Sequence, residues 1–233
     1  MNRGANLAGG LLLCAAAAVS APGAAMQHPV AGSIADVISD NDRDFVPDRL
    51  DEMVVVAGVA TTYPHPARGD IVYIVIQDDS AGVRLLTEDA SLLAGIVPGS
   101  LIEASGRLTH RRGVEEVFVE TLHVRGTTKP PEPRDVLIAD LLSELHVHEL
   151  VRVTGTLSIA NLVPGEPLGA TIADRSGTIP VRIVSRLRDH ADLAAEWAFA
   201  GDVEIVGIAG QADLVAEVRE LTPTLASSAP GIR

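Results

Sequence analysis

The chain is poor in cysteine, in aromatic residues and in positive charge. Its single cysteine, Cys14, lies in an apolar N-terminal stretch, so the rest of the chain can form no disulfide and offers no thiolate. Aromatic residues make up 3% of the sequence, so a packed interior must be built from Val, Ile, Leu and Ala. The formal net charge of -13 repels phosphate backbones and argues against general nucleic-acid affinity.

The N-terminus has the layout of a bacterial secretory signal peptide. Arg3 precedes an Ala/Leu-rich run over residues 7–19, and small residues follow up to Ala25. We expect cleavage of residues 1–25 and a periplasmic or secreted protein; an uncleaved membrane anchor is the alternative. Leu13 stands where a lipidation signal has a small residue, so we expect no lipid anchor. No later stretch is apolar enough to predict a membrane span.

An internal repeat is the strongest pattern in the sequence. Three segments of the first half recur in order in the second half: residues 53–61 match 150–158, residues 74–85 match 170–181, and residues 99–106 match 201–207. Repeats of this length are typical of duplicated small domains. The sequence therefore predicts two domains, over residues 52–126 and 147–222.

Each copy has the element order of an OB fold. Valines alternate with their neighbours at the start of both copies, as in half-buried strands. The sequences at 78–82 and 174–177 are typical of tight hairpin turns. Helical composition over residues 88–95 and 189–200 adds a short helix between strands 3 and 4. This order predicts a mainly β protein of two tandem five-stranded OB-fold Greek-key barrels.

The remaining segments connect or flank the two domains. Residues 127–146 contain Pro130, Pro131 and Pro133, which predict a semi-rigid linker. We expect a short helix to follow, capped by Asp135 and ending at Leu145. Residues 26–51 form an acidic lead-in, and residues 223–233 form a Pro/Ser-containing tail that we expect to be unstructured.

Three motifs together resemble a known group of domains. They are Val56-Ala-Gly-Val-Ala-Thr, Ile76-Gln-Asp-Asp-Ser-Ala-Gly and Val97-Pro-Gly-Ser-Leu-Ile-Glu-Ala-Ser-Gly. With the linker and second repeat, they resemble the OB-like extracytoplasmic regions of some bacterial sensor histidine kinases over about residues 40–222. The resemblance implies a sensory or binding role. Such kinases continue into a membrane span and catalytic domains, so we expect here a free-standing binding protein or an accessory to a membrane sensor.

The acidic lead-in contains a calcium-like pattern. Oxygen donors stand at the spacing of an EF-hand loop, which suits Ca²⁺ as a cofactor. The ligands would be Asp40, Asp42, Asp44, the Val46 carbonyl, Asp48 and Asp51. Phe45 replaces the glycine usual at the sharp turn, which favours the alternative of a solvated acidic segment.

The loops around the usual OB ligand face are basic and aromatic in the first copy only. Arginine forks match phosphate or carboxylate, and tyrosine offers a stacking face. The corresponding loops of the second copy, at 161–166 and 211–213, have no basic residue. We predict a site for a small anionic ligand, a saccharide or a protein partner, formed by Tyr63, His65, Arg68, Tyr73, Arg84, His110, Arg111 and Arg112. Ordinary solvated loop charge is the alternative.

No pattern indicates catalysis. His146 and His148 could share a face and hold a metal ion, but no third ligand is recognisable. The hairpin and strand patterns explain four acidic residues that a nuclease could use, namely Asp78, Asp79, Glu115 and Glu116. A nucleophile elbow, phosphate loop and zinc-protease motif are absent from the sequence. We expect a non-catalytic binding module, with a single-stranded oligonucleotide-binding protein and then a metal-dependent phosphodiesterase as the alternatives.

Overall fold

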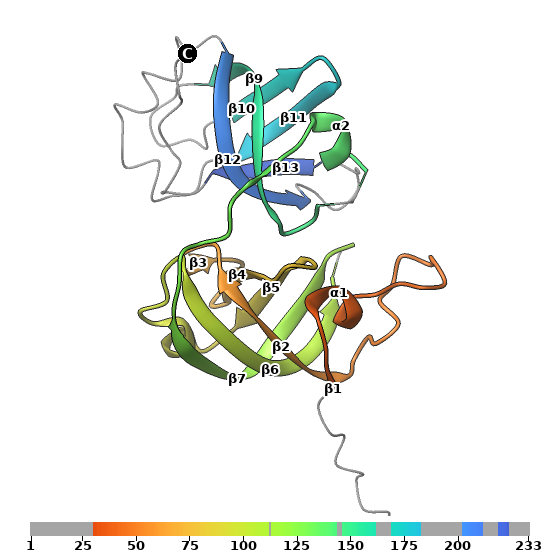
Figure 1. Cartoon of the computed structure of the whole chain (residues 1–233), viewed down its shortest axis with the longest axis vertical. Helices are drawn as coiled ribbons and strands as arrows, with labels where there is room; N and C mark the ends of the chain where they lie inside the picture. Colours follow the sequence, from red (N-terminus) through yellow and green to blue (C-terminus); the bar gives the residue numbers. More distant parts are fainter. Residues whose placement is uncertain are drawn as a thin grey trace, which may run out of the picture.

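The protein consists of two β-sheets that are stacked along its long axis (Figure 1). The computed structural model describes residues 30–111, 113–143, 146–161, 169–182, 202–211 and 219–223. The predicted signal peptide therefore lies outside the described residues. Within them, no helix is long and apolar enough to cross a bilayer.

The first sheet closes into a mixed five-stranded barrel. Its elements are β1 (Val30–Ala31), α1 (Ile34–Val37), β2 (Met53–Ala60), β3 (His65–Pro66), β4 (Val72–Gln77), β5 (Gly82–Thr87), the 3-10 helix η1 (Ala90–Leu93), β6 (Ser100–His110) and β7 (Glu115–Thr127). The strand order is β1-β2-β6-β7-β5-β4-β3, and the additional pairing of β2 with β4 closes the barrel. Only β5–β7 within the barrel is parallel. This topology confirms the predicted OB-like barrel of the first copy.

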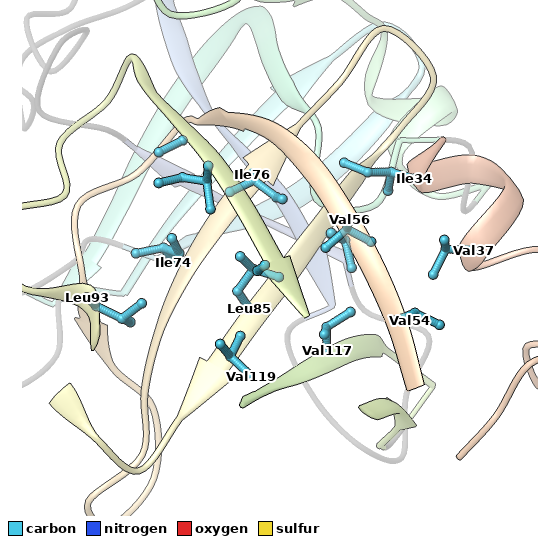
Figure 2. Packing of buried hydrophobic residues seen from close by; sticks show 14 of the residues in the cluster. Ile34, Val37, Val54, Val56, Ile74, Ile76, Leu85, Leu93, Val117 and Val119 are labelled. Carbon is cyan, nitrogen blue, oxygen red and sulfur yellow. The ribbon is translucent and has the colours of Figure 1, made fainter. Parts of the chain in front are cut away.

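Alternate residues of the barrel strands form its core (Figure 2). Val54 and Val56 of β2 point inward with Ile74 and Ile76 of β4, as the period of a half-buried strand requires. The short helix α1 adds two fully buried residues of the segment expected as an acidic lead-in, Ile34 and Val37. The first barrel core thus begins well before residue 52.

The second sheet has its own core and the same order of pairings. Its elements are β8 (Arg134–Asp135), α2 (Ile138–Leu141), β9 (Leu150–Asn161), β10 (Gly169–Asp174), β11 (Gly177–Arg182), β12 (Asp202–Gln211) and β13 (Arg219–Pro223). The strand order is β10-β11-β13-β12-β9-β8, and β9 also pairs with β10. Ile138 and Leu141 of α2 belong to this second core.

The helices are shorter than predicted. The helix expected over 88–95 is the single 3-10 turn η1, capped by the Asp89 side chain. The helix expected from Asp135 is wrong at its start, because Asp135 lies in β8 and its carboxylate binds Arg152. Backbone pairing with β9 keeps that residue extended, so α2 begins only at Ile138. The helix predicted over 189–200 lies outside the described residues.

A short strand and a short helix precede the first long strand of each sheet (β2 and β9), and an aspartate of the following hairpin binds each helix. Asp78 Oδ2 accepts a hydrogen bond from the Ile34 N–H at 2.8 Å, and Asp174 Oδ2 accepts one from the Ile138 N–H at 3.0 Å. Ser80 and Ser176 accept from the next N–H of each helix. The sequence repeat therefore extends over this entry unit as well.

These bonds also set the charge of the two carboxyl groups. Burial alone would raise the pKa of Asp78, but hydrogen bonds from the Ile34 N–H and from Ser80 and Ala81 lower it below its ordinary value. Burial opposes a lowered pKa at Asp174 too, and the bonds from Ser176 and the Ile138 N–H outweigh it. Both aspartates are thus held ionised as helix caps.

Candidate functional site

Three of the predicted ligand residues meet on the outer face of the first barrel. His65 of β3 lies opposite Tyr73 of β4, and their ring centroids are 5.7 Å apart. The Arg84 guanidinium of β5 lies 4.7 Å from the centre of the Tyr73 ring, in cation–π geometry. Arg84 Nη1 also binds Glu116 Oε1 of β7 at 2.9 Å. We call these four residues the basic–aromatic cluster.

Strand register places the cluster. Arg84 lies opposite Val75 in the antiparallel β4–β5 pair, so Tyr73 is its diagonal neighbour on the same face. Arg84 also lies opposite Glu116 in the parallel β5–β7 pair. Because β4 and β5 are strands 2 and 3 of the OB order, this is the face over which OB folds usually bind their ligands.

The second sheet covers part of this face. Val75 points away from its own barrel core, yet only 2% of it is exposed, because it packs with Leu150, Val206 and Ile208. The Gln77 side-chain oxygen accepts a hydrogen bond from the Leu150 N–H at 2.9 Å. The two halves therefore form a contact with an apolar centre and a satisfied polar partner.

A glycine permits this close approach. A Cβ atom added at Gly82 would lie 2.0 Å from the carbonyl oxygen of His148, far inside van der Waals contact. His148 precedes β9, has a positive φ of 65° and is 1% exposed. Its N–H donates to the Ala209 carbonyl at 2.7 Å, which holds this turn to β12.

A small pocket lies between the two halves. It encloses about 20 Å³ and takes residues from both sheets. Its lining consists of Thr62, His65, Tyr73, Val75, Arg84, His148, Arg182, Ile208 and Gly210. Residues of both repeats thus line one pocket where the two halves meet.

The other predicted ligand residues lie apart from this cluster. Tyr63 is half-buried in the β2–β3 connection, and Arg68 is exposed in the turn between β3 and β4. His110 ends β6, and Arg111 follows it as an exposed residue of the β6–β7 turn. Arg112 lies outside the described residues. The structure therefore brings His65, Tyr73 and Arg84 together, but no described contact joins Arg68, His110 or Arg111 to them.

Sequence reasoning missed the contribution of the second half. His148 and Arg182 line the pocket, although the loops of the second copy gave no basic signal. The partner of His148 in the sequence pattern, His146, faces Glu149 at 3.2 Å instead of sharing a metal site with it. Nothing in the local sequence of β11 marks Arg182 as a pocket residue, because only the docking of the two sheets places it there.

The predicted calcium loop is folded around its aspartates. Carboxylate oxygens of Asp40, Asp42 and Asp48 lie within 4.8 Å of one another. The Asp40 carboxylate accepts bonds from the N–H groups of Arg43 and Phe45, at 2.7 and 2.9 Å. Phe45 adopts the positive φ of 66° that the missing glycine would provide. The backbone at that position thus has the left-handed conformation that glycine favours.

Charge repulsion is visible within this acidic loop. Burial would raise the pKa of Asp40, but the Phe45 N–H and the neighbouring Asp42 side chain lower it. The Asp44 N–H acts to lower the pKa of Asp42, but the hydrogen bond to Asp40 and the nearby negative charges raise it. Asp44 and Asp51 complete the predicted ligand set without belonging to the described three-carboxylate group, and the half-buried Val46 follows Phe45.

Two of the four acidic residues considered for catalysis have structural partners. Asp78 caps α1, and Glu116 binds Arg84 in a largely buried ion pair. Asp79 is exposed at the hairpin, and Glu115 lies on β7 opposite His110. The four carboxylates therefore do not converge as a group that could hold one metal ion, as far as the described residues go.

The first half is an OB-fold-like β-barrel whose β4–β5 face adjoins a second sheet. No protein-family model matches the chain, and no curated protein matches it. Among solved structures, it is similar to an aspartyl-tRNA synthetase from Leishmania major, with a TM-score of 0.35 and 13% identity over 49% of this chain and 25% of that one. The chain thus spans about a quarter of the synthetase.

Two smaller proteins are covered almost completely by the similarity. One is an OBody bound to hen egg-white lysozyme, with a TM-score of 0.31 and 16% identity over 38% of this chain and 94% of that one. The other is the hypothetical protein ygiW from E. coli, with a TM-score of 0.31 and 16% identity over 40% of this chain and 88% of that one.

Proposed function

We propose that the chain is an exported, non-catalytic ligand- or partner-binding module built on two tandem OB folds. The pairings of β9, β10, β11, β12 and β13 repeat those of β2, β4, β5, β6 and β7, including the one parallel pair within each set. This correspondence supports a second OB fold. Export rests on the signal-peptide pattern of residues 1–25.

One observation carries the binding role. An otherwise acidic protein gathers His65, Tyr73 and Arg84 on the usual OB ligand face, next to the junction with the second half. Ligand sites occur preferentially where two domains meet, with a few converging polar groups in apolar surroundings. A small anionic ligand suits the arginine and the aromatic ring best.

The covered face favours a compact ligand over a polymer. A single-stranded oligonucleotide would have to lie across β4 and β5, where Val75 is already packed under the second sheet. The net charge of -13 opposes such a strand as well. Oligonucleotide binding therefore stays the second candidate, and a metal-dependent phosphodiesterase the third, because Asp78 and Glu116 are engaged structurally.

The resemblance to sensor-kinase extracytoplasmic regions suggests the setting. In that setting the module would report a bound ligand to a membrane sensor as an accessory subunit. The other candidate partners are a saccharide and the sensor itself. Either could contact the first-barrel loops that carry Arg68 and Arg111, since both residues are exposed.

Thermal unfolding of the chain without residues 1–25 tests the proposal. Small organic phosphates, dicarboxylates and anionic oligosaccharides form the panel, and we expect at least one to raise the melting midpoint. Arg84→Gln should remove this rise, while Arg107→Gln, an exposed arginine of β6 outside the cluster, should keep it. A labelled oligo-dT whose binding collapses with salt would support the second candidate instead. Phosphodiester hydrolysis with Ca²⁺ or Mg²⁺ would support the third.

A further inference from the structure

A groove on the second half occupies the same place as a pocket on the first half. The groove lies over Leu137, residues 154–156 and residues 173–175, and we call it the second-half groove. Its volume is about 490 Å³, and that of the pocket on the first half is about 410 Å³. Strand pairing and the hairpin bonds align four lining residues of the two sites. They are Val59, Gln77, Asp78 and Asp79 on the first half, and Thr156, Ala173, Asp174 and Arg175 on the second.

On the first half, an extended segment of the chain itself forms one wall of the site. This segment is the part of the linker over residues 128–134, which leaves β7 and leads into β8 (Figure 1). Among the residues that the structure describes, no such segment lines the second-half groove, and Leu137 at its side is 40% exposed. The first half therefore shows which kind of occupant this position accommodates, namely an extended chain segment.

The edge of β9 has a gap in its pairing at the second-half groove. β8 pairs with β9 as far as Arg152, and β10 pairs with β9 only from Thr156 onward. The Val136 N–H donates to the Arg152 carbonyl at 3.1 Å, so Arg152 directs its backbone groups toward this edge. Backbone groups alternate in direction along a strand, so the N–H and carbonyl of Thr154 also face the edge, where neither β8 nor β10 pairs with them. Such groups are a template for pairing with another chain.

The charge of one hairpin residue differs between the two sites. On the first half, Asp79 lines the pocket to which the linker brings Lys129 and Arg134. On the second half, the exposed Arg175 takes the place of Asp79. The neighbouring Asp174 carboxylate already accepts hydrogen bonds from α2 and from its own hairpin. An occupant of the second-half groove is therefore complementary when it carries a carboxylate where the linker carries a cation.

We propose that the second-half groove binds an extended, acidic segment of a partner protein. The segment pairs with the N–H and carbonyl of Thr154 as a short added strand, and one of its carboxylates meets Arg175. Leu137 and Ala173 contact its apolar atoms. The partner segment thus takes the position that the linker has on the first half. This site lies on other strands than the basic–aromatic cluster, so it goes beyond the small-anion site proposed above and either site can fail alone.

NMR of the nitrogen-15-labelled chain without residues 1–25 tests the proposal. The acidic probe is a peptide with the sequence of residues 127–134 in which glutamate replaces Lys129 and Arg134, and the linker probe keeps both cations. We expect fast hydrogen exchange of the Thr154 N–H in the free chain, and exchange about tenfold slower at a tenfold excess of the acidic probe over its Kd.

The two probes also measure the effect of charge. In about 150 mM salt the net charge of -13 is screened over more than roughly 8 Å, so the local charge of Arg175 decides the preference. We expect the acidic probe to bind roughly two- to fivefold more tightly than the linker probe, which is the range of an exposed ion pair.

Variants then locate the effect. Arg175→Asp introduces the charge that the first half has at this position, and it should reverse the preference between the probes. Arg107→Asp is the matched charge reversal, because the Arg107 side chain binds the Asp51 carbonyl on the first half, and it should leave the preference unchanged. Leu137→Ser should weaken the binding of both probes. An acidic probe with N-methylated glutamates should bind about fivefold less tightly, because these residues can no longer donate to the Thr154 carbonyl.

Four results would overturn the proposal. Unchanged exchange of the Thr154 N–H with either probe would remove the site, and an unchanged preference in Arg175→Asp would remove the acidic partner. Slow exchange in the dilute free chain would assign the groove to another segment of the same chain. Protection that grows with protein concentration would assign it to a second copy. Probe binding lost in Arg84→Gln would place the probe at the basic–aromatic cluster, whereas probe binding without any panel ligand would remove only the small-anion site.

Discussion

The outward faces of β4–β5 and β10–β11 are equivalent in the two repeats but have opposite environments. Strand pairing aligns Val75 with Thr171 and Arg84 with Pro180. Val75 is buried beneath the second sheet, whereas Thr171 is exposed. Covering an apolar side chain is favourable, while covering a hydroxyl without a partner is not. The two repeats share a backbone frame, and their outward side chains decide which face is covered.

The surfaces formed by β9 and β12 in the second repeat and by β2 and β6 in the first also differ. Here the second repeat has the apolar residues and the first has polar ones. The apolar patch that covers the first barrel consists of Leu150, Val206 and Ile208. The equivalent residues in the first repeat are Met53, Ser105 and Arg107, of which Arg107 is exposed. The comparison teaches that one complementary pair of surfaces joins the repeats, and that each repeat contributes one member of the pair.

The largest effect should come from adding a side chain where the halves are closest. Gly82→Val would collide with the His148 carbonyl, so we expect a loss of about 3 kcal/mol in the free energy of unfolding, measured with urea. Thr178→Val is the matched control, because Thr178 is the aligned, exposed position of β11. It should change stability by less than about 0.5 kcal/mol. Equal losses in both variants would contradict the asymmetry.

Exchanging the aligned residues sharpens the same comparison. Val75→Thr places a hydroxyl under the second sheet and should cost about 1–2 kcal/mol in chemical denaturation. Thr171→Val alters an exposed residue and should stay within about 0.5 kcal/mol of the parent. A neutral Val75→Thr would mean that the contact with Leu150 contributes little to stability.

The hairpin aspartates should behave alike in the two repeats. Asp78→Asn and Asp174→Asn each weaken a helix cap, and each should cost about 1 kcal/mol at pH 7. The folded-state pKa of both is lowered from 3.8, so their stabilisation is present above that pH and is lost as the pH falls through the folded value. The melting midpoint, measured between about pH 2 and 6, should depend less on pH in the double variant than in the parent. An unchanged pH profile would refute the role of the charge.

The smallest expected effect concerns the connections that lead into strand 1 of each repeat. Residues 38–52 form the acidic loop, whereas the aligned connection holds His148 at the interface. If the loop binds calcium, calorimetric titration should give heat and a raised melting midpoint, and Asp42→Asn should remove both. Asp70→Asn, an exposed aspartate elsewhere, is the control. A calcium titration that gives no heat would support the alternative, in which residues 38–52 are a solvated acidic segment.

The first barrel could be predicted because its signals are local. Alternating valines at Val54 and Val56 and the turn chemistry after Gln77 each act within a few residues. The first entry helix, α1, was missed because four residues give no helical period, whereas the second, α2, was predicted with the wrong start. The recurrence of Ile34-Ala-Asp as Ile138-Ala-Asp was the signal that could have revealed α1.

The composition of the site could be predicted only in part. Tyr73 and Arg84 were recognised from their place in the OB order, and their mutual contact follows from register. His148 and Arg182 could not be recognised from the sequence, because only the docking of the two sheets brings them to the pocket. A strand valine such as Val75 has the same sequence signature whether it faces its own core or a neighbouring domain.

Because a single complementary pair of surfaces joins the two repeats, the number of repeats that can stack in a row is limited. A third repeat joined after residue 223 would meet Thr171 and Pro180 on β10 and β11, where it would find no apolar patch to pack against. A unit placed in front would face Arg107. Head-to-tail contacts propagate indefinitely when every unit carries both surfaces. Polar residues at these two outer surfaces therefore disfavour further head-to-tail stacking, and apolar substitutions at both surfaces should favour it.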